Sequence, residues 1–266
     1  MSRPLIGNRN SWVDFEKCIL EVFILALEIL RNKNTLPVYE DSVQSRDSLN
    51  RRLDICLRDA ILEWERINET DILTTPKSNL GKQPDLDNEE IVNDYERTKP
   101  DFQWEFRDRL GNGNSRNSIF RNYEVECKRL GANLSSGRSL TKEYVSEGIL
   151  RFTISTHRYG QFAYSGLMIG YVQDTELQTV LNEVNRAAQS AFLPELLLSS
   201  VGWKLDVNRL DHRLNRLNVE PTPFDLRHLW VDLHHHYNQQ PVVPKKKASG
   251  QKKRTTKKPN LSSTSQ

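Results

Sequence analysis

The sequence predicts an α/β domain with a mixed central sheet, which is preceded by helices and followed by a basic tail. Three observations lead to this prediction. Two long stretches near the N-terminus repeat apolar residues at helical spacing. An alternation of apolar and polar residues follows over 102–108, and a Gly- and Asn-rich segment over 111–118 connects it to a second strand-like run. Apolar runs of strand and helix character then alternate, which is typical of α/β domains.

Length and composition indicate a soluble domain from a reducing compartment. The 266 residues can bury a sizeable core as one domain with appendages. Hydrophobic residues make up 36% and charged residues 27%, which is typical of a rather polar protein. The three widely spaced cysteines argue against a disulfide framework or a zinc finger, so a cytoplasmic location is expected. The apolar run from Cys18 to Leu30 is too short to span a bilayer, and no membrane partner is expected.

The positive charge of the chain is concentrated at its C-terminus. The tail 245–266 holds eight of the 38 basic residues and no acidic residue, which leaves 30 basic against 35 acidic residues elsewhere. A Lys-rich segment with almost no apolar residues is expected to be disordered. Its charge has two interpretations, attraction to nucleic-acid phosphates or improved solubility. The basic residues are Lys245, Lys246, Lys247, Lys252, Lys253, Arg254, Lys257 and Lys258.

Two helices are expected before the first strand. An apolar stripe at helical spacing predicts a helix over 12–32, and a second helix is predicted from near Ser42 to Asn68. A loop over 68–94 follows. The acidic residues near the start of the second helix either compensate the helix dipole or supply an additional metal ligand. These residues are Glu40, Asp41 and Asp47.

The central prediction is an antiparallel hairpin. Residues 102–108 have the pattern of a half-buried strand, with Pro100 at its edge, and the strand Tyr123–Leu130 follows the turn at 111–118. If the turn is centred after Asn114, facing residues have numbers that sum to about 229. One face is then apolar, and the other gathers two carboxylates and a lysine within about 5–8 Å. A slip of two residues would keep these faces. The expected pairs are Asp101 with Lys128, Gln103 with Glu126, Glu105 with Glu124, Phe102 with Cys127, Trp104 with Val125, and Phe106 with Tyr123.

A known signature is similar to this hairpin. Pro100-Asp101, a hairpin interval and then Glu126-Cys127-Lys128 resemble the signature of the PD-(D/E)xK phosphodiesterases, which share the restriction-endonuclease-like fold. The resemblance covers approximately residues 40–175 and includes the order of the expected helices and strands. An earlier pair, Pro84-Asp85, has no strand pattern after it and is set aside. The resemblance implies a restriction-endonuclease-like core whose mixed central sheet is flanked by helices.

The resemblance also implies a role for each matching residue. Asp101, Glu126 and Lys128 would be catalytic, and a Mg²⁺ ion (or Mn²⁺) would be bound by Asp101, Glu126 and the backbone carbonyl of Cys127. The Cys127 thiol would point into the core. Lys128 would orient or deprotonate the attacking water and stabilise charge on the phosphate. The additional upstream acid of the family would be Asp47 or Glu40.

Further elements are expected downstream of the hairpin. A helix is predicted from Ser139 or Thr141 to about Phe152, and its Lys142 and Arg151 are either contacts to a nucleic-acid backbone or ordinary surface charges. The run His234-His235-His236 is interpreted as a solvated segment, because adjacent residues of an extended chain cannot all face one ion. The remaining predicted elements are a buried strand over 163–172, a helix over 175–198, and strands over 201–205 and 224–233, with a helix as the alternative for 224–233.

Two hypotheses for the function follow. The first is a metal-dependent nuclease that hydrolyses phosphodiester bonds, with DNA as the expected substrate and a restriction or phage-defence role expected from the family. The second is a catalytically inactive, nuclease-like module that binds nucleic acid or a protein. A homodimer, or a partner subunit that supplies specificity, is expected with the first. The domains would be residues 1–95 with the N-terminal helices and loop, the core 96–244, and the tail 245–266.

Overall fold

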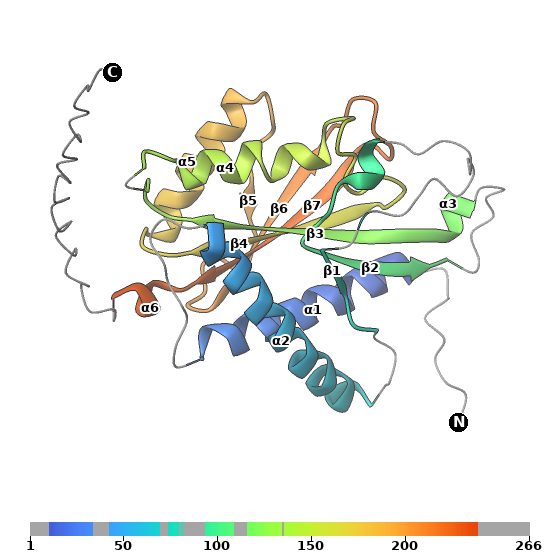
Figure 1. Cartoon of the computed structure of the whole chain (residues 1–266), viewed down its shortest axis with the longest axis horizontal. Coiled ribbons are helices and arrows are strands. Elements are labelled where there is room, and N and C mark those ends of the chain that lie inside the picture. Colours follow the sequence, from blue (N-terminus) through green and yellow to red (C-terminus); the bar gives the residue numbers. More distant parts are fainter. Residues whose placement is uncertain are drawn as a thin grey trace, which may run out of the picture.

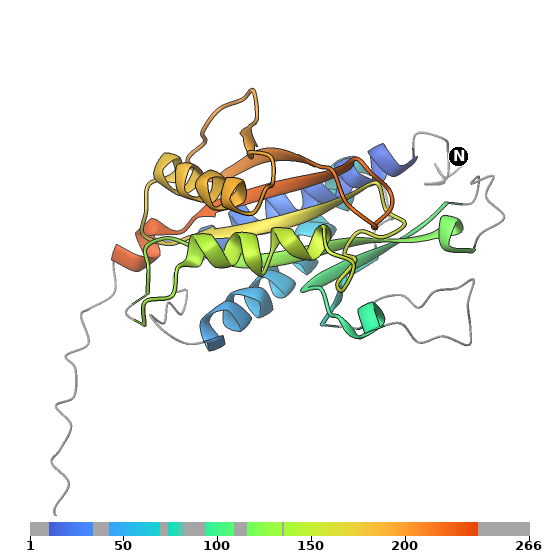
Figure 2. The same ribbon diagram turned by 90° about the horizontal axis from the view of Figure 1, so that it is seen from above.

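The computed structural model describes residues 11–33, 43–69, 74–79, 81, 94–108, 116–134 and 136–238. They form an α/β fold of three layers, in which helices cover both faces of a central sheet (Figure 1). Figure 2 shows the same layers from above, with the α4 and α5 layer in front of the strands. One layer consists of α1 (Ser11–Arg31) and α2 (Val43–Asn68), and the opposite layer consists of α4 (Leu140–Ser146) and α5 (Leu177–Ser190).

The sheet in the described part of the chain is mixed and has seven strands in the order β1-β2-β3-β4-β7-β6-β5. The pairs β3–β4 and β4–β7 are parallel, whereas the other neighbours are antiparallel. The strands are β1 (Lys77–Ser78), β2 (Phe102–Arg107), β3 (Phe120–Leu130), β4 (Ser165–Val172), β5 (Leu197–Leu198), β6 (Val207–Leu214) and β7 (Phe224–Asp232). The same ranges also contain the short helical segments η1 (Asp94–Arg97), α3 (Arg116–Ile119), η2 (Ile149–Phe152) and α6 (His234–Asn238).

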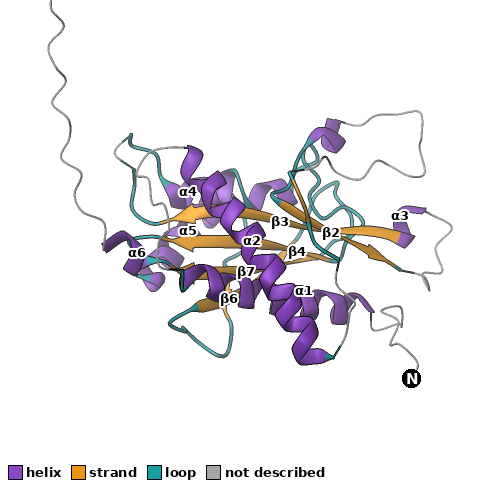
Figure 3. Cartoon of the chain, turned by 60° about the horizontal axis from the view of Figure 1, so that its bottom comes forward, coloured by secondary structure: helices purple, strands orange, loops and turns teal. Residues whose placement is uncertain are grey.

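The core has one apolar cluster on each face of the sheet. The stripe on α1 packs with α2 against the sheet, where the ring of Phe23 contacts those of Phe102 and Trp104. Figure 3 shows α1 and α2 lying across this face. On the other face, α4 and α5 form the second cluster with residues of the central strands. All eight residues of β4 are buried, as expected for a strand with parallel neighbours and helices on both sides. No helix in the described ranges has both the length and the apolar character needed to cross a membrane.

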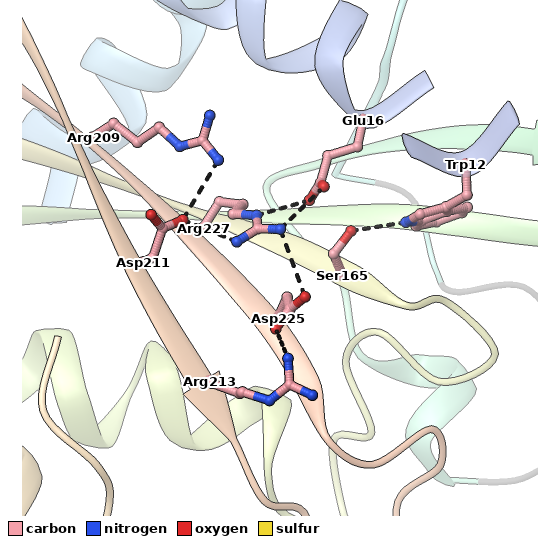
Figure 4. Close-up of polar contacts among 8 residues, drawn as sticks. All are labelled: Trp12, Glu16, Ser165, Arg209, Asp211, Arg213, Asp225 and Arg227. Atoms are coloured by element: carbon pink, nitrogen blue, oxygen red, sulfur yellow. Dashed lines mark hydrogen bonds and ion pairs between the residues drawn. The ribbon is translucent and has the colours of Figure 1, made fainter. Parts of the chain in front are cut away.

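A polar network ties the start of α1 to the sheet (Figure 4). The indole of Trp12 donates a hydrogen bond to Ser165 Oγ at 2.9 Å. One turn later, Glu16 lies 3.2 Å from the Arg227 guanidinium, which also donates to Asp211 at 2.9 Å. The network therefore joins α1 to β4, β6 and β7. Its other members are Arg209, Arg213 and Asp225.

Most of the predicted elements are present, with shifted ends. The predicted helix over 175–198 ends at Ser190, because Phe192 has a positive φ of 58° and Pro194 follows it. The predicted strand over 201–205 is wrong. Strand β6 is not among the predicted elements, and its exposed or half-buried polar residues alternate with buried ones. These polar residues form ion pairs in the network around Arg227. Residues 207–214 therefore lack the apolar run by which a buried strand is recognised in a sequence.

The predicted hairpin is present, but its register differs by two residues. Phe102 pairs with Val125 instead of Cys127, and Gln103 pairs with Glu124 instead of Glu126. The end of the predicted turn over 111–118 belongs to α3, which spans Arg116–Ile119, and β3 begins earlier than predicted, at Phe120. The connection is therefore centred at lower residue numbers. Because the shift is even, the two faces of the hairpin keep their predicted members.

The histidine run is not a solvated segment. His234, His235 and His236 lie in α6, and only part of their surface is exposed. Ring nitrogens of His235 and His236 lie 3.0 Å and 2.7 Å from the Arg31 carbonyl, to which they can donate. The run therefore satisfies the C-terminal end of α1, where backbone carbonyls lack helical partners.

Candidate active site

The β2–β3 hairpin brings together the three residues of the predicted signature. Glu126 and Lys128 are two residues apart on β3, so their side chains project from the same face. Both are buried, with exposed fractions of 1% and 6%. Asp101 lies directly before β2, and its Oδ2 accepts a hydrogen bond from the Cys127 amide at 2.7 Å. Asp101 is also buried, so three charged residues converge within the fold.

The two carboxylate oxygens of Glu126 have different surroundings. Oε1 accepts hydrogen bonds from Lys128 Nζ at 2.6 Å and from Arg151 Nη1 at 3.1 Å. Oε2 is buried and has no hydrogen-bond partner among the described residues. Buried polar atoms are normally paired, because leaving a charged oxygen without a partner is costly. The arrangement therefore suits an additional electropositive group on the Oε2 side.

Arg151 is part of this site and not a separate surface charge. A turn at Gly148 breaks the predicted helix into α4 and η2, and η2 places Arg151 against Glu126. A Cβ at Gly148 would collide with the Tyr144 carbonyl oxygen, so the turn requires glycine. Burial alone would lower the pKa of Arg151, but the Glu126 carboxylate, together with Tyr159 and Asp101, raises it above its ordinary value. Arg151 therefore stays protonated and stabilises the buried carboxylate.

Cys127 faces the opposite side of the sheet. Its side chain is fully buried in the cluster under α1 and α2, as expected from the sequence. Burial raises the pKa of this thiol well above its ordinary value, and the neighbouring Asp101 and Glu126 carboxylates add to the rise. The thiol is thus held in its protonated form, which is a poor nucleophile and a poor metal ligand. Only the backbone of Cys127 is suited to the site.

A cavity of about 440 Å³ lies on the α2 side of the hairpin. Asp47, from the first part of α2, and Asp101 both line it. The structure thus places one of the two predicted upstream acids beside the hairpin, whereas Glu40 lies outside the described residues. The other lining residues are Asn50, Arg51, Asp54, Ser78, Asn79 and Phe102.

A second cavity, of about 200 Å³, lies on the α4 side, and Lys128 forms part of its wall. Arg151 is another of its lining residues. Lys142 is exposed and does not line it; its amide instead donates to Ser139 Oγ at 3.4 Å, which confirms the predicted helix cap. The remaining lining residues are Arg129, Arg138, Leu140, Glu143 and Glu147. The predicted contacts from the tail lie outside the described residues.

The donor set fits a hard divalent ion that keeps part of its water. The described residues contain no group of three His, Cys, Asp or Glu side chains that could hold a metal ion among themselves. Mg²⁺, however, is usually bound through one or two carboxylates, with water and substrate oxygens completing its shell. Glu126 Oε2, Asp101 and the Cys127 carbonyl are oxygen donors of the kind that suits Mg²⁺ or Mn²⁺.

Several residues beside the site are not predicted by any motif in the sequence. Arg138 and Tyr159 are the clearest cases: Arg138 lines the smaller cavity, and the Tyr159 hydroxyl lies 3.4 Å from Arg151 Nη1. Neither residue belongs to a recognisable spacing. The only available signal was the position of Arg138 directly before the Ser139 cap, at the start of the helix that follows the Glu-x-Lys strand.

Comparisons of the chain with models of known protein families, with curated proteins and with solved structures find no match.

Proposed function

We propose that this chain is a metal-dependent nuclease with a restriction-endonuclease-like fold, which hydrolyses phosphodiester bonds in DNA. One observation carries the proposal most directly: the buried Glu126 pairs with Lys128 through Oε1, while Oε2 has no partner among the described residues. A second carboxylate, Asp101, is bound to the adjacent amide. Two carboxylates and a lysine in this order resemble the PD-(D/E)xK signature.

The residues have distinct roles in this proposal. Asp101, Glu126 and the Cys127 carbonyl bind Mg²⁺ or Mn²⁺, with Asp47 as an additional acid on the α2 side. The chemistry that such an ion would supply is polarisation of a phosphoryl oxygen and a more acidic bound water. Lys128 holds its ammonium beside Glu126 and stabilises the negative charge that grows on the phosphate. Arg151 adds a second positive charge beside the buried Glu126 carboxylate, with its Nη1 at 3.1 Å from Oε1.

A second candidate function is supported by a specific observation. Asp101 Oδ2 is already engaged by the Cys127 amide, and Lys128 and Arg151 both occupy Glu126 Oε1. Such closed pairing also suits a nuclease-like module that binds nucleic acid without cutting it. The two candidates differ in one result, cleavage that depends on a divalent ion.

The test is cleavage of plasmid and linear DNA by the full chain with Mg²⁺, with Mn²⁺ and with EDTA. We expect Asp101→Asn and Lys128→Met to lower the cleavage rate by at least about a hundredfold, because Asp101 would hold the metal ion and Lys128 would stabilise the negative charge on the reacting phosphate. Lys77→Met and Glu105→Gln are matched controls, since this exposed pair joins β1 to β2 at 3.6 Å and neither residue lines the two cavities beside the site.

Wild-type rates in the Asp101 and Lys128 variants would contradict the assignment of the site. DNA binding without any metal-dependent cleavage by the folded wild-type chain would instead support the binding module. Circular dichroism of each variant separates loss of chemistry from loss of folding.

A further inference from the structure

The cavity on the α4 side carries more positive than negative charge. We call it the cationic cavity and define it by its lining residues, Lys128, Arg129, Arg138, Leu140, Glu143, Glu147 and Arg151. Four of these residues are basic and two are acidic. One of the acidic residues, Glu147, has a side chain that is 63% exposed and lies 3.9 Å from Arg151, so solvent screens its charge. The lining thus favours an anion.

Arg138 is held in a fixed orientation at this cavity. Its Nε and Nη2 atoms donate to the two carboxylate oxygens of Glu143, both at 2.7 Å. This two-bond fork restricts the guanidinium to one plane. Glu143 belongs to α4, whose N-terminal end is capped by Ser139, so a helix anchors the fork. Orientation before binding lowers the entropy that a ligand contact must overcome.

The size and place of the cationic cavity limit what it can bind. Its volume of about 200 Å³ is below the roughly 300–1,000 Å³ typical of sites for cofactors and other small molecules. It therefore suits one phosphate group better than a whole nucleotide. Lys128 belongs both to the cavity wall and to the candidate catalytic group, so an anion bound there would lie beside the Glu126–Lys128 pair.

We propose that the cationic cavity binds one phosphate group of a polynucleotide, next to the bond that is cleaved, and that Arg138 is a positioning residue for it. This inference rests on the proposed nuclease function. The phosphate has two possible sources, an internal diester of the backbone or a 5′-terminal monoester, and both present the same anionic oxygens. Arg138 acts by placing the substrate and takes no part in bond cleavage.

The test measures binding without metal, so that it is independent of cleavage. Fluorescence anisotropy in EDTA compares the full wild-type chain with Arg138→Ala, for two labelled single-stranded oligonucleotides that differ only in a 5′-phosphate or a 5′-hydroxyl. We expect Arg138→Ala to weaken binding about fivefold and to reduce the slope of log affinity against log salt by about 0.7, the value for one phosphate contact on a single strand. Arg138→Lys should recover part of the affinity, because it keeps the charge but loses the fork.

Arg66→Ala is the matched control. Arg66 makes the same fork with Glu63 on the exposed side of α2, with distances of 2.9 Å and 2.6 Å. Its removal should leave both affinity and salt slope unchanged. A loss in Arg138→Ala for both oligonucleotides would indicate an internal phosphate, and a loss confined to the 5′-phosphorylated one would indicate a terminal phosphate.

Equal affinity and equal salt slope in Arg138→Ala and Arg66→Ala would overturn the inference, as would the absence of oligonucleotide binding by the wild-type chain. The Arg138 side chain is 43% exposed, so Arg138→Ala is expected to fold. Absence of cleavage by the wild-type chain, with the binding loss intact, would remove the nuclease proposal and leave the phosphate site. Normal cleavage by the wild-type chain, with unchanged binding in Arg138→Ala, would remove the phosphate site and leave the nuclease proposal.

Discussion

Glu126 is the residue on which the candidate site depends. It is almost fully buried, and its charge is balanced by Lys128 on the same strand and by Arg151 from η2. A buried charge is tolerated only when such partners are present, since an unpaired one is strongly destabilising. The two basic residues differ in origin. The position of Lys128 follows from the alternation of side chains along β3, whereas the position of Arg151 depends on the turn at Gly148 that precedes η2.

Replacement of Arg151 by Met should lower the free energy of unfolding by about 1–2 kcal/mol, because the buried Glu126 loses a charged partner. The loss is limited to this range because Arg151 is partly exposed and solvent screens its charge. Urea unfolding at neutral pH measures the change. Arg58→Met, which removes an exposed partner of Asp54, is the control and should cost less than about 0.5 kcal/mol. In a double-mutant cycle with Glu126→Gln, additive effects would show that the two side chains do not interact.

At the scale of elements, strands β6 and β7 carry two buried histidines toward α4 and α5. The rings of His212 and His228 lie 5.6 Å apart, and His228 Nδ1 lies 2.8 Å from the Tyr144 hydroxyl of α4. Burial lowers the pKa of His212 to about 4, partly offset by the Pro194 carbonyl. Burial also lowers the pKa of His228 well below its ordinary value, and His212 adds to this effect. Both rings are therefore neutral in the folded protein near pH 6.

This pair predicts loss of stability in mild acid. Between the ordinary histidine pKa of about 6.5 and the folded value of about 4 for His212, the unfolded chain binds protons that the folded chain does not. The free energy of unfolding should fall by about 1.4 kcal/mol per pH unit and per histidine in this window. Urea titrations at pH 7.5 and pH 5 measure the fall. His212→Leu should reduce it, and an equal fall in wild-type and variant chains would show that His212 is not responsible.

At the scale of the whole molecule, the sheet separates two apolar clusters, and the candidate site lies where the β2–β3 hairpin meets both helical layers. The cavity with Asp47 and Asp101 is on the α2 side, and the cationic cavity is on the α4 side. In the proposed function, Asp47 and Asp101 would supply acidic groups from the first cavity, and the basic residues of the second cavity would bind phosphate beside Glu126. The tail 245–266 adds eight basic residues to a chain that is otherwise net acidic.

Removal of residues 245–266 tests the function of the tail. We expect the shortened chain to unfold at the same temperature, because a Lys-rich segment with almost no apolar residues contributes little to a core. Its affinity for DNA should fall, with a salt slope smaller by about 0.9 for each duplex phosphate that the tail neutralises in the full chain. Anisotropy titrations from low to physiological salt measure both quantities. Unchanged affinity together with lower solubility would support the solubilising interpretation.

Local patterns in the sequence are sufficient for the helical pair α1 and α2, for the strands β2 and β4, and for the faces of the hairpin, whereas the pattern over β7 also allows a helix. These features depend on residue spacing along a short segment, so that Glu126 and Lys128 must share a face wherever the strand lies. Even the shifted register kept those faces, because a strand repeats every two residues.

Other features were decided by contacts between residues that are distant along the chain. The register depends on where α3 and β3 begin, and β6 has polar alternate positions because α1 and β7 supply their partners. Arg151 contacts Glu126 through the turn at Gly148, which ends α4 and lets η2 place Arg151 against β3. Asp47 comes near Asp101 through the packing of α2 against the sheet. Spacing contains no information about such contacts, since they arise from burial and charge pairing in three dimensions.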